Sequence, residues 1–591
     1  MDTYTINFFV ASALAAVLAV FLTRRKRFRL AALPVAPVLH YVLFYNYDSG
    51  LVGGIFPLLV PYAGALYTAV LFAFFASYKA DSGQQAPERK LSAVRAILSG
   101  VALFLLILYS QVIPWAIDTF PLSNVEAVLF TVFAGANEGS EEFVISSFMA
   151  NAIRPALHLF ACTAALIAVV SLLVSKRKTR VDFRFWKLRL TLAGKGGAQV
   201  FQSLGNFALI AMAAYCFVIS LVLPGIVTSA PFHALFQQPI DSELYREHYA
   251  NPDSVQMHAP EQPRNLIVIF LESMETNFAR YTPEIDSLFR EFGFAPGGVN
   301  VSGTSWTIAG ITGKLCGIPL NMPMGIDEYT GKLPTYLPHA KCLMNVLANQ
   351  GYEQVYVQGS SGDFTQKRDF WKVHGNVAIH DIEYFKKTKK IPQDYNVFWG
   401  FEDRKLYGFV KEELDSLATG DKPFALYMLT VDTHQPFGYT DDLCQAQFSA
   451  VQEKFPQALR CASMQLGDFL VWASKQPWFA NTVISVMGDH TMDMLSAKAN
   501  VPKDEPLYWT NFVLNSALPR PEKKRQYSSL DMFPTLLESM GFSLEGRAMG
   551  LGKSLYSGEA TLLERYGQKT LDSLLRERSI QYDYFLMGKR E

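Results

Sequence analysis

The sequence predicts two regions of different class, a multi-pass α-helical membrane domain followed by an α/β domain. Residues 1–230 contain long apolar runs, whereas residues 250–591 have the mixed composition of a soluble domain. In the second region short apolar runs alternate with helical patterns, which is typical of buried parallel strands with helices on both faces. The chain has 591 residues and a formal net charge of zero. It therefore has room for both regions, and nothing argues for a nucleic-acid partner.

Six apolar runs in the first region are each near the length that a helix needs to cross a bilayer. The second run is short and contains Pro34 and Pro37, so we leave open whether five or six of the runs span. The runs lie at residues 6–23, 30–46, 54–77, 96–117, 155–174 and 205–228.

Basic clusters set the expected orientation, because cytoplasmic loops carry an excess of Lys and Arg. The clusters at residues 24–29, 79–95 and 175–189 are expected in the cytoplasm, and the acidic connection 118–154 outside. Five or six crossings both place the chain after residue 228 on the exterior. The expected domains are a membrane domain at 1–230, a connector at 231–263, an exterior α/β domain at 264–560 and an amphipathic or tail segment at 561–591.

Four apolar runs in the second region predict strands that are buried on both faces of a parallel sheet. They lie at residues 265–271, 354–358, 424–429 and 483–487. Helical patterns lie at residues 283–292, 305–315, 342–350, 456–474 and 531–540. In such folds ligands bind outside the carboxyl ends of the strands, which identifies the residues that follow each run as site candidates.

Three of the predicted strands deliver a carboxylate or an imidazole at the carboxyl end. Glu272 follows the first strand, His434 comes after the third, and Asp489-His490 follow the fourth. Glu272, Asp489 and His490 together form a ligand set of hard oxygens and one nitrogen, which suits Mn²⁺, Mg²⁺ or Zn²⁺. Taken singly, each of these residues also fits an ordinary solvated strand end or turn.

The stretch between the first two strands combines a glycine with hydroxyl side chains at a helix start. Gly303 permits a backbone conformation that other residues avoid, and Thr304, Ser305 or Thr307 can cap the helix that follows. A hydroxyl at this place lies where backbone N–H groups and the helix dipole favour a phosphate. An ordinary helix cap and a nucleophile are both compatible with this pattern.

Four cysteines belong to the second region. In an exported domain they are expected to be oxidised. Four cysteines allow three pairings, and proximity along the chain favours Cys316–Cys342 and Cys444–Cys461.

Taken in order, these residues resemble the sulfatase-like branch of the alkaline phosphatase superfamily. The branch includes membrane-anchored lipoteichoic acid synthases, lipid A phosphoethanolamine transferases and the phosphoglycerol transferases that modify osmoregulated periplasmic glucans, and the likeness is strongest to the last group. It covers about residues 264–555. The motifs that carry it are Leu271-Glu272-Ser273, Gly303 through Gly310, Cys316 through Leu320, Val431 through Pro436, Gly488-Asp489-His490 and Ser529 through Leu537.

The resemblance implies roles for individual residues. Thr304 corresponds to the nucleophile and would complete a metal shell formed by Glu272, Asp489 and His490. His434 matches the histidine that contacts the transferred group. Lys367 or Arg368 falls where relatives have a basic residue near the headgroup, and the alignment does not choose between them; Trp306 is a further candidate to line the substrate site.

The resemblance also implies a function. The expected reaction transfers phosphoglycerol from phosphatidylglycerol to a periplasmic glycan, an osmoregulated glucan first of all, through a covalent phosphothreonine. It would depend on a divalent metal ion, Mn²⁺ or Mg²⁺ with Zn²⁺ as the alternative. The protein would be a multi-pass protein in the lipid bilayer of the bacterial inner membrane, with a periplasmic catalytic domain.

Three other functions remain open at this point. The nearest is a phosphoethanolamine transferase that acts on lipid A or a glycan; the others are a phosphodiesterase that transfers the group to water and a non-catalytic membrane sensor. Sulfate ester hydrolysis is disfavoured, because residues 304–308 lack the Pro and Arg of the sulfatase Cys/Ser-x-Pro-x-Arg motif.

Overall fold

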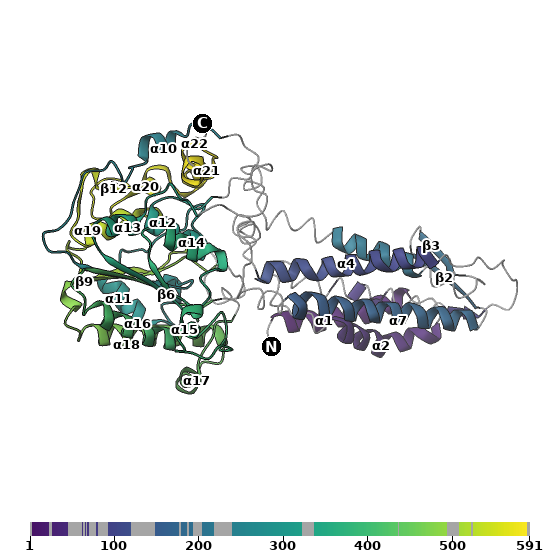
Figure 1. Ribbon diagram of the computed structural model, residues 1–591. Helices are drawn as coiled ribbons and strands as arrows, with labels where there is room; N and C mark the ends of the chain where they lie inside the picture. The colour runs from purple at the N-terminus through teal and green to yellow at the C-terminus, as the bar shows by residue number, and fades with distance from the viewer. Residues whose placement is uncertain are drawn as a thin grey trace. The chain divides into compact units, whose positions relative to one another are not determined.

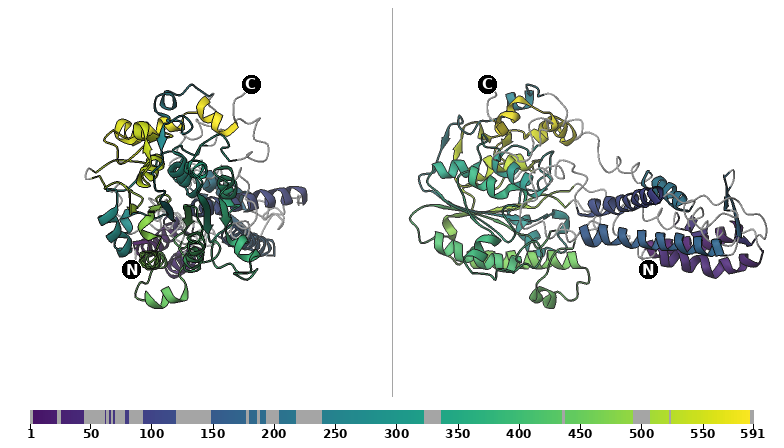
Figure 2. Two further views of the ribbon diagram at one scale, coloured as in Figure 1. Left: turned by 60° about the vertical axis from the view of Figure 1, so that its left-hand side comes forward. Right: turned by 45° about the vertical axis from the view of Figure 1, so that its right-hand side comes forward.

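The structure is a computed structural model whose described residues divide into two compact units, one up to residue 217 and one from residue 239 onwards. Figures 1 and 2 show the elements of both units. The described residues are 3–22, 26–44, 62, 65–66, 68–69, 78–80, 93–119, 148–176, 179–185, 188–192, 204–217, 239–321, 336–434, 437–492, 507–521 and 524–587.

Helices form most of the described part of the N-terminal unit, and they coincide with predicted apolar runs. Small residues bring α1 and α2 together, with Ala19, Ala32 and Ala36 fully buried between them. A second contact joins α4 to α7 through Leu103, Ile107 and Ala156. The helices are α1 (Thr3–Leu22), α2 (Lys26–Phe44), α4 (Ala93–Thr119), the π-helix η2 (Met149–Ile153), α7 (Arg154–Lys176) and a helix at 204–217.

No helix among the described residues has both the length and the apolar character that crossing a membrane requires. The predicted membrane domain is therefore not confirmed, and most of the run at 54–77 lies outside the described residues. The unit also contains an antiparallel sheet that was not predicted, with strands β1 (Tyr78–Ala80), β2 (Thr179–Phe185) and β3 (Leu188–Leu192).

The C-terminal unit is built on a six-stranded sheet with the order β10-β9-β5-β8-β6-β7. Neighbouring strands are parallel except for β10, which is antiparallel to β9. All four predicted strands are confirmed, whereas the short β7 and β10 were not predicted. The strands are β5 (Asn265–Leu271), β6 (Glu353–Gln358), β7 (Ala378–His380), β8 (Phe424–Leu429), β9 (Thr482–Gly488) and β10 (Asn511–Leu514).

Helices cover both faces of this sheet, as Figure 1 shows. The side chains of β5 alternate between the two cores: Leu266, Val268 and Phe270 pack on one face, and Ile267, Ile269 and Leu271 on the other. On the first face lie α12 (Thr307–Cys316), α13 (Leu343–Asn349), α14 (Lys367–Val373) and α19 (Met532–Ser539); on the second lie α11 (Pro283–Phe292), α15 (Ile382–Lys387), α16 (Asp403–Leu417) and α18 (Lys454–Ala473).

The C-terminal helices belong to the fold of this unit. Leu562, Leu571, Leu575, Tyr582 and Phe585 are buried in the first core, so the segment after residue 560 is a packed part of the domain and not a solvated tail. The remaining elements are α10 (Glu243–His248), α17 (Asp442–Gln447), α20 (Leu562–Tyr566), α21 (Gln568–Arg576), α22 (Ile580–Met587) and the strand pairs β4 (Met257–His258) with β11 (Ser543–Leu544) and β12 (Ala548–Met549) with β13 (Gly552–Lys553).

Both predicted disulfides are present. Cys316, the last residue of α12, is bonded to Cys342 at the start of α13, with an S–S distance of 1.96 Å. Cys444 of α17 is bonded to Cys461 of α18, at 1.90 Å. By restricting the unfolded chain, each bond contributes roughly 3 kcal/mol to stability.

His374, at the end of α14, should make this domain sensitive to acid. Its side chain is fully buried against Phe370, and burial lowers the pKa of His374 to about 4. In the unfolded chain His374 is therefore protonated below about pH 6.5, whereas in the folded domain it is protonated only below about pH 4. The free energy of unfolding is therefore unaffected by His374 above pH 6.5, and it falls by up to about 3 kcal/mol as the pH drops towards 4. The His374→Phe substitution should flatten that part of the stability curve, measured by urea unfolding between pH 7 and 4.

His258 provides the matched control, because it is exposed. His258→Gln should leave the pH dependence of unfolding as in the unmodified chain. An unchanged slope in the His374→Phe variant would show that this histidine contributes nothing to the acid sensitivity.

Candidate active site

The predicted ligand residues meet at the carboxyl ends of two adjacent strands. β5 pairs in parallel with β9 so that Leu271 lies opposite Gly488, and the next residue of each strand is an acid. His490 Nε2 lies 3.7 Å from Glu272 Oε1 and 3.6 Å from Asp489 Oδ2. One ligand atom from each of the three side chains lies within 4.8 Å of the other two. This spacing suits a single cation bound by two carboxylates and one imidazole.

The hydrogen bonds around the cluster leave one ligand atom unused. Asp489 Oδ1 accepts the N–H of Ser273 at 2.7 Å and that of His490 at 2.8 Å. Asp489 Oδ2 is buried and accepts no hydrogen bond from any described residue. Because a buried carboxylate oxygen is costly without a partner, the residues present fit a metal ion.

The rest of the cluster is held by backbone contacts. Glu272 donates its N–H to Thr430 Oγ1 at 3.0 Å, and its carbonyl accepts from Thr433 Oγ1 at 2.6 Å. Ser273 has a φ of 51°, a conformation that few non-glycine residues adopt. It donates its hydroxyl to Glu272 Oε1 at 2.7 Å. Strain of this kind is typical of a site whose geometry is imposed by its surroundings.

The cluster concentrates negative charge out of contact with water. Glu272 is 3% exposed and Asp489 is fully buried. Burial and the neighbouring Asp489 carboxylate raise the pKa of Glu272 to about 8. A bound divalent cation would stabilise both carboxylates in the ionised form.

Thr307 brings a second hydroxyl to Glu272, beside that of Ser273. It is the first residue of α12, and its Oγ1 lies 3.4 Å from Glu272 Oε2. Its side chain is partly exposed, whereas the residues that follow it in the helix are buried. The first N–H groups of a helix have no partner within the helix and favour an anion. A phosphate at this helix end would therefore lie beside both the Thr307 hydroxyl and the carboxylates.

Thr304, which the resemblance implied as nucleophile, has a different environment. It is fully buried. Its Oγ1 accepts the N–H of Val301 at 2.9 Å and donates to the carbonyl of Val301 at 2.8 Å. These bonds close a tight turn at Gly303, whose φ is +73°. Thr304 thus closes its own turn, whereas the hydroxyl with a contact to a carboxylate of the cluster is that of Thr307, three residues further on.

Helix α12 reaches the cluster through an unusually close backbone contact. A Cβ added to Gly310 would lie 2.0 Å from the Asp489 carbonyl oxygen. The same oxygen accepts a hydrogen bond from Lys314 Nζ at 2.6 Å, and Nζ also lies 4.1 Å from the centre of the Trp509 ring. Burial lowers the pKa of Lys314 to about 7. Because Gly310 has no side chain, α12 can approach Asp489 closely, and the hydrogen bond from Lys314 holds the helix there.

The structure distinguishes the two basic residues that the sequence left open. Arg368 Nε lies 2.6 Å from Asp363 and its Nη2 lies 2.5 Å from Asp381, so this guanidinium is part of a structural ion-pair network. Lys367 is 3% exposed. Burial lowers the pKa of Lys367 to about 8, and the negative charge of Glu272 opposes that shift.

Lys367 directly follows a strained turn. Thr365 and Gln366, the two residues before it, have φ values of 55° and 54°. Nζ donates to the carbonyl of Phe364 at 2.9 Å and lies 4.9 Å from the centre of the Phe364 ring. Of the two basic residues, Lys367 is the one whose pKa is lowered by burial and raised by the charge of Glu272.

His434 and an aromatic pair extend this side of the site. The His434 ring lies 4.4 Å from that of Trp399, and Trp399 lies 5.6 Å from Phe364. Trp399 was not among the predicted residues, since nothing in its local sequence relates it to a site. Trp306, the residue directly before α12, is 7% exposed and packs in the first core. Gln435 and Pro436 of the quoted motif lie outside the described residues.

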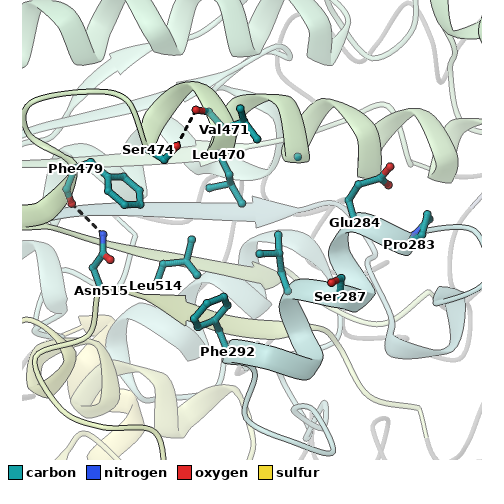
Figure 3. Close-up of a pocket in the computed structure, with 12 residues that line it drawn as sticks. Pro283, Glu284, Ser287, Phe292, Leu470, Val471, Ser474, Phe479, Leu514 and Asn515 are labelled. Atoms are coloured by element: carbon teal, nitrogen blue, oxygen red, sulfur yellow. Dashed lines mark hydrogen bonds between the residues drawn. The ribbon is translucent and has the colours of Figure 1, made fainter.

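Two other features of this unit are separate from the ligand cluster. Asp441, Cys444 and Cys461 also lie close together, but the two cysteines form a disulfide. A pocket of about 690 Å³ lies between α11 and α18 and is lined mainly by apolar side chains such as Leu288, Phe292 and Leu470 (Figure 3). Its acid, Glu284, is paired with Arg460 at 2.6 Å. Neither feature presents a reactive group.

Comparison with known proteins supports the expected family. The sulfatase family model matches residues 264–542, which include every residue of the ligand cluster. Phosphoglycerol transferase I of Xanthomonas campestris is 28% identical over 321 residues, which is 51% of this chain and 44% of that protein. Phosphoglycerol transferase I of Escherichia fergusonii is 30% identical over 312 residues, 51% of this chain and 40% of that protein. The chain thus spans less than half the length of these curated relatives.

Among solved structures, the lipoteichoic acid synthase from Listeria monocytogenes is 16% identical. The match covers 56% of this chain and 96% of that one, with a TM-score of 0.41.

Asp489→Asn should weaken metal binding because it replaces a buried ligand carboxylate with a neutral amide. In calorimetric titrations with Mn²⁺ and Zn²⁺ we expect the affinity to fall roughly 100-fold or more. The metal-induced rise in the thermal midpoint should disappear with it. Asp468→Asn, on an exposed position of α18, is the matched control and should bind as the unmodified chain does. Equal affinities in the two variants would exclude Asp489 as a ligand.

Proposed function

Taking residues 264–542 as a sulfatase-family domain, we propose that this chain transfers phosphoglycerol from phosphatidylglycerol to a glycan, with Thr307 as the nucleophile. The observation that carries the proposal is the Thr307 hydroxyl at the start of α12, 3.4 Å from Glu272 in the ligand cluster. A nucleophile, an anion-binding helix end and a metal ligand set are thereby joined in one site. The names of the relatives at 28–30% identity favour phosphoglycerol as the group transferred.

The reaction has two displacements at one phosphorus atom. In the first, Thr307 Oγ1 forms a bond to the phosphorus of phosphatidylglycerol, and the bond to the diacylglycerol oxygen breaks; that oxygen takes up a proton and diacylglycerol leaves. In the second, a hydroxyl of the glycan attacks the same phosphorus, and the Thr307 oxygen leaves and is protonated again. The product is a phosphoglycerol diester on the glycan, and the enzyme returns to its starting form.

The side chains around Thr307 have separate tasks in this scheme. A divalent ion bound by Glu272, Asp489 and His490 would make the threonine hydroxyl more acidic and neutralise charge on the phosphoryl group. Lys367, whose pKa is about 8, supplies a partly desolvated ammonium that can pair with the phosphate. His434 is the group proposed to exchange protons with the leaving and entering oxygens.

The location of the donor requires the domain to work at a lipid surface. We propose that residues 1–230 hold it there, at the outer face of a bacterial inner membrane; the long apolar runs and the basic clusters of this region support that arrangement. The two disulfides fit an oxidising compartment such as the periplasm. The proposed acceptor is an osmoregulated glucan. The proposed metal is Mn²⁺ or Mg²⁺, with Zn²⁺ as the alternative.

The site of the covalent adduct tests the nucleophile. After incubation with phosphatidylglycerol vesicles, peptide mass spectrometry should find a phosphoglycerol group on Thr307. Thr307→Ala should lower the transfer rate by roughly three orders of magnitude or more, because the attacking oxygen is removed. Thr304→Ser keeps the hydroxyl that closes the turn at Val301 and should retain most of the activity. An adduct on Thr304 instead would refute this assignment.

Labelled lipids test the donor. Vesicles carrying glycerol-labelled phosphatidylglycerol should label an added periplasmic glucan, and vesicles carrying ethanolamine-labelled phosphatidylethanolamine should not. Labelling from the second lipid alone would establish a phosphoethanolamine transferase. Release of labelled glycerol phosphate with no labelled glucan would establish a phosphodiesterase, and no turnover of either lipid a non-catalytic protein.

A further inference from the structure

The C-terminal helices contact the loop that leads into α12. Ser302 donates its N–H to Asp572 Oδ1 of α21 at 2.7 Å. One turn earlier in the same helix, Gln568 donates its side-chain amide to the carbonyl of Asn300 at 3.1 Å. Helix α21 therefore binds the loop at two points, although some 270 residues separate the partners in the sequence.

A second set of bonds joins these helices to the segment that follows α12. Asn321 donates its N–H to Tyr582 Oη at 2.7 Å and its side-chain amide to the carbonyl of Leu575 at 2.6 Å. The residue before it, Leu320, donates its N–H to the carbonyl of Gly303 at 2.8 Å. The loop before α12 and the segment after it are thus attached to each other and to α21, and the segment is also attached to α22.

The loop is also connected to the ligand cluster. Asn300 donates its side-chain amide to Thr491 Oγ1 at 2.9 Å, and the carbonyl of Thr491 lies 2.8 Å from His490 Nδ1. Between these attachments the turn is closed by the bonds of Thr304 to Val301. Hydrogen bonds therefore link the loop to the segment of His490 on one side and to α21 on the other, where the charged group is the Asp572 carboxylate.

We propose that Asp572 is a positioning residue for the Thr307 nucleophile, and that α21 and α22 serve to hold the loop 300–304 against the active site. The carboxylate accepts the Ser302 N–H, a bond of the stronger, charge-assisted kind. It thereby fixes the turn from which α12 and Thr307 extend. The catalytic consequence rests on the proposed function, whereas the effect on the loop itself does not.

The test uses the full chain with Asp572→Ala, Asp572→Asn and the control Ser573→Ala, an exposed neighbour on the same helix. Hydrogen exchange read by mass spectrometry follows the amides of residues 299–306. We expect Asp572→Ala to speed exchange in this peptide at least about tenfold, since the Ser302 N–H loses its acceptor. Asp572→Asn retains an oxygen that accepts the same N–H, and Ser573→Ala removes nothing, so both should exchange as the unmodified chain does.

The catalytic readout is made on the same proteins with phosphatidylglycerol vesicles. In Asp572→Ala we expect kcat to fall by roughly 10- to 100-fold, the loss expected from a nucleophile displaced by about 1 Å. KM and Mn²⁺ affinity should stay within about threefold, because the proposed ligands directly follow β5 and β9, whose pairing the substitution does not touch. Asp572→Asn should recover most of kcat, which a loss of folding would not allow.

Three results would overturn the proposal: unchanged exchange in Asp572→Ala, faster exchange with an unchanged kcat, or a loss of kcat that occurs together with a loss of metal affinity and thermal stability. If the unmodified chain transfers no phosphoglycerol, the proposed function fails. The exchange experiment still decides whether Asp572 holds the loop.

Discussion

The parallel pairing of β5 with β9 is the constraint on which the site depends. Its register sets Leu271 opposite Gly488, so that Glu272 and Asp489 leave the sheet side by side. Helix α12 is then brought to the same edge by the contact of Gly310 and Lys314 with the Asp489 carbonyl. A shift of one residue in that register would turn one of the two carboxylates to the opposite face of the sheet. The pairing of these two strands therefore decides where the proposed metal ligands and the proposed nucleophile lie.

Several features of this edge are costly for folding. Glu272, Asp489, Lys314 and Lys367 are all at most 3% exposed. Three non-glycine residues beside them, Ser273, Thr365 and Gln366, have positive φ values. Buried charges and strained backbone persist only where neighbouring contacts over-determine them. Here those contacts are the sheet, the Cys316–Cys342 bond at the far end of α12 and the C-terminal helices. The buried charges and the strained residues lie together at the edge of the sheet where a bound divalent ion and a phosphate would stabilise them.

The sequence predicted those parts of the domain that follow from local pattern. Buried strands are continuous apolar runs, and all four that were long enough to be seen are present, whereas β7 and β10 have only three and four residues. The disulfide pairing could be predicted because the bonded cysteines are close in the sequence, 26 and 17 residues apart. Trp399, Asp572 and Lys314 could not be found in the same way, because their partners are distant in the chain and no period or motif relates them.

Sequence alone determined that a carboxylate and an Asp-His pair end two strands, and that a glycine and several hydroxyls begin the helix between them. It could not choose among those hydroxyls, because Thr304 and Thr307 are both suited to a helix start. The tertiary structure places the two hydroxyls in different surroundings, and this difference supports Thr307 as the proposed nucleophile. Helix α12 begins at Thr307, and Thr304 bonds within its own loop. Arg368 pairs with Asp363 and Asp381, whereas the pKa of Lys367 is lowered by burial and raised by the charge of Glu272. The physical reason is that a side chain's role depends on where a helix begins and what packs against it, and long-range contacts decide both.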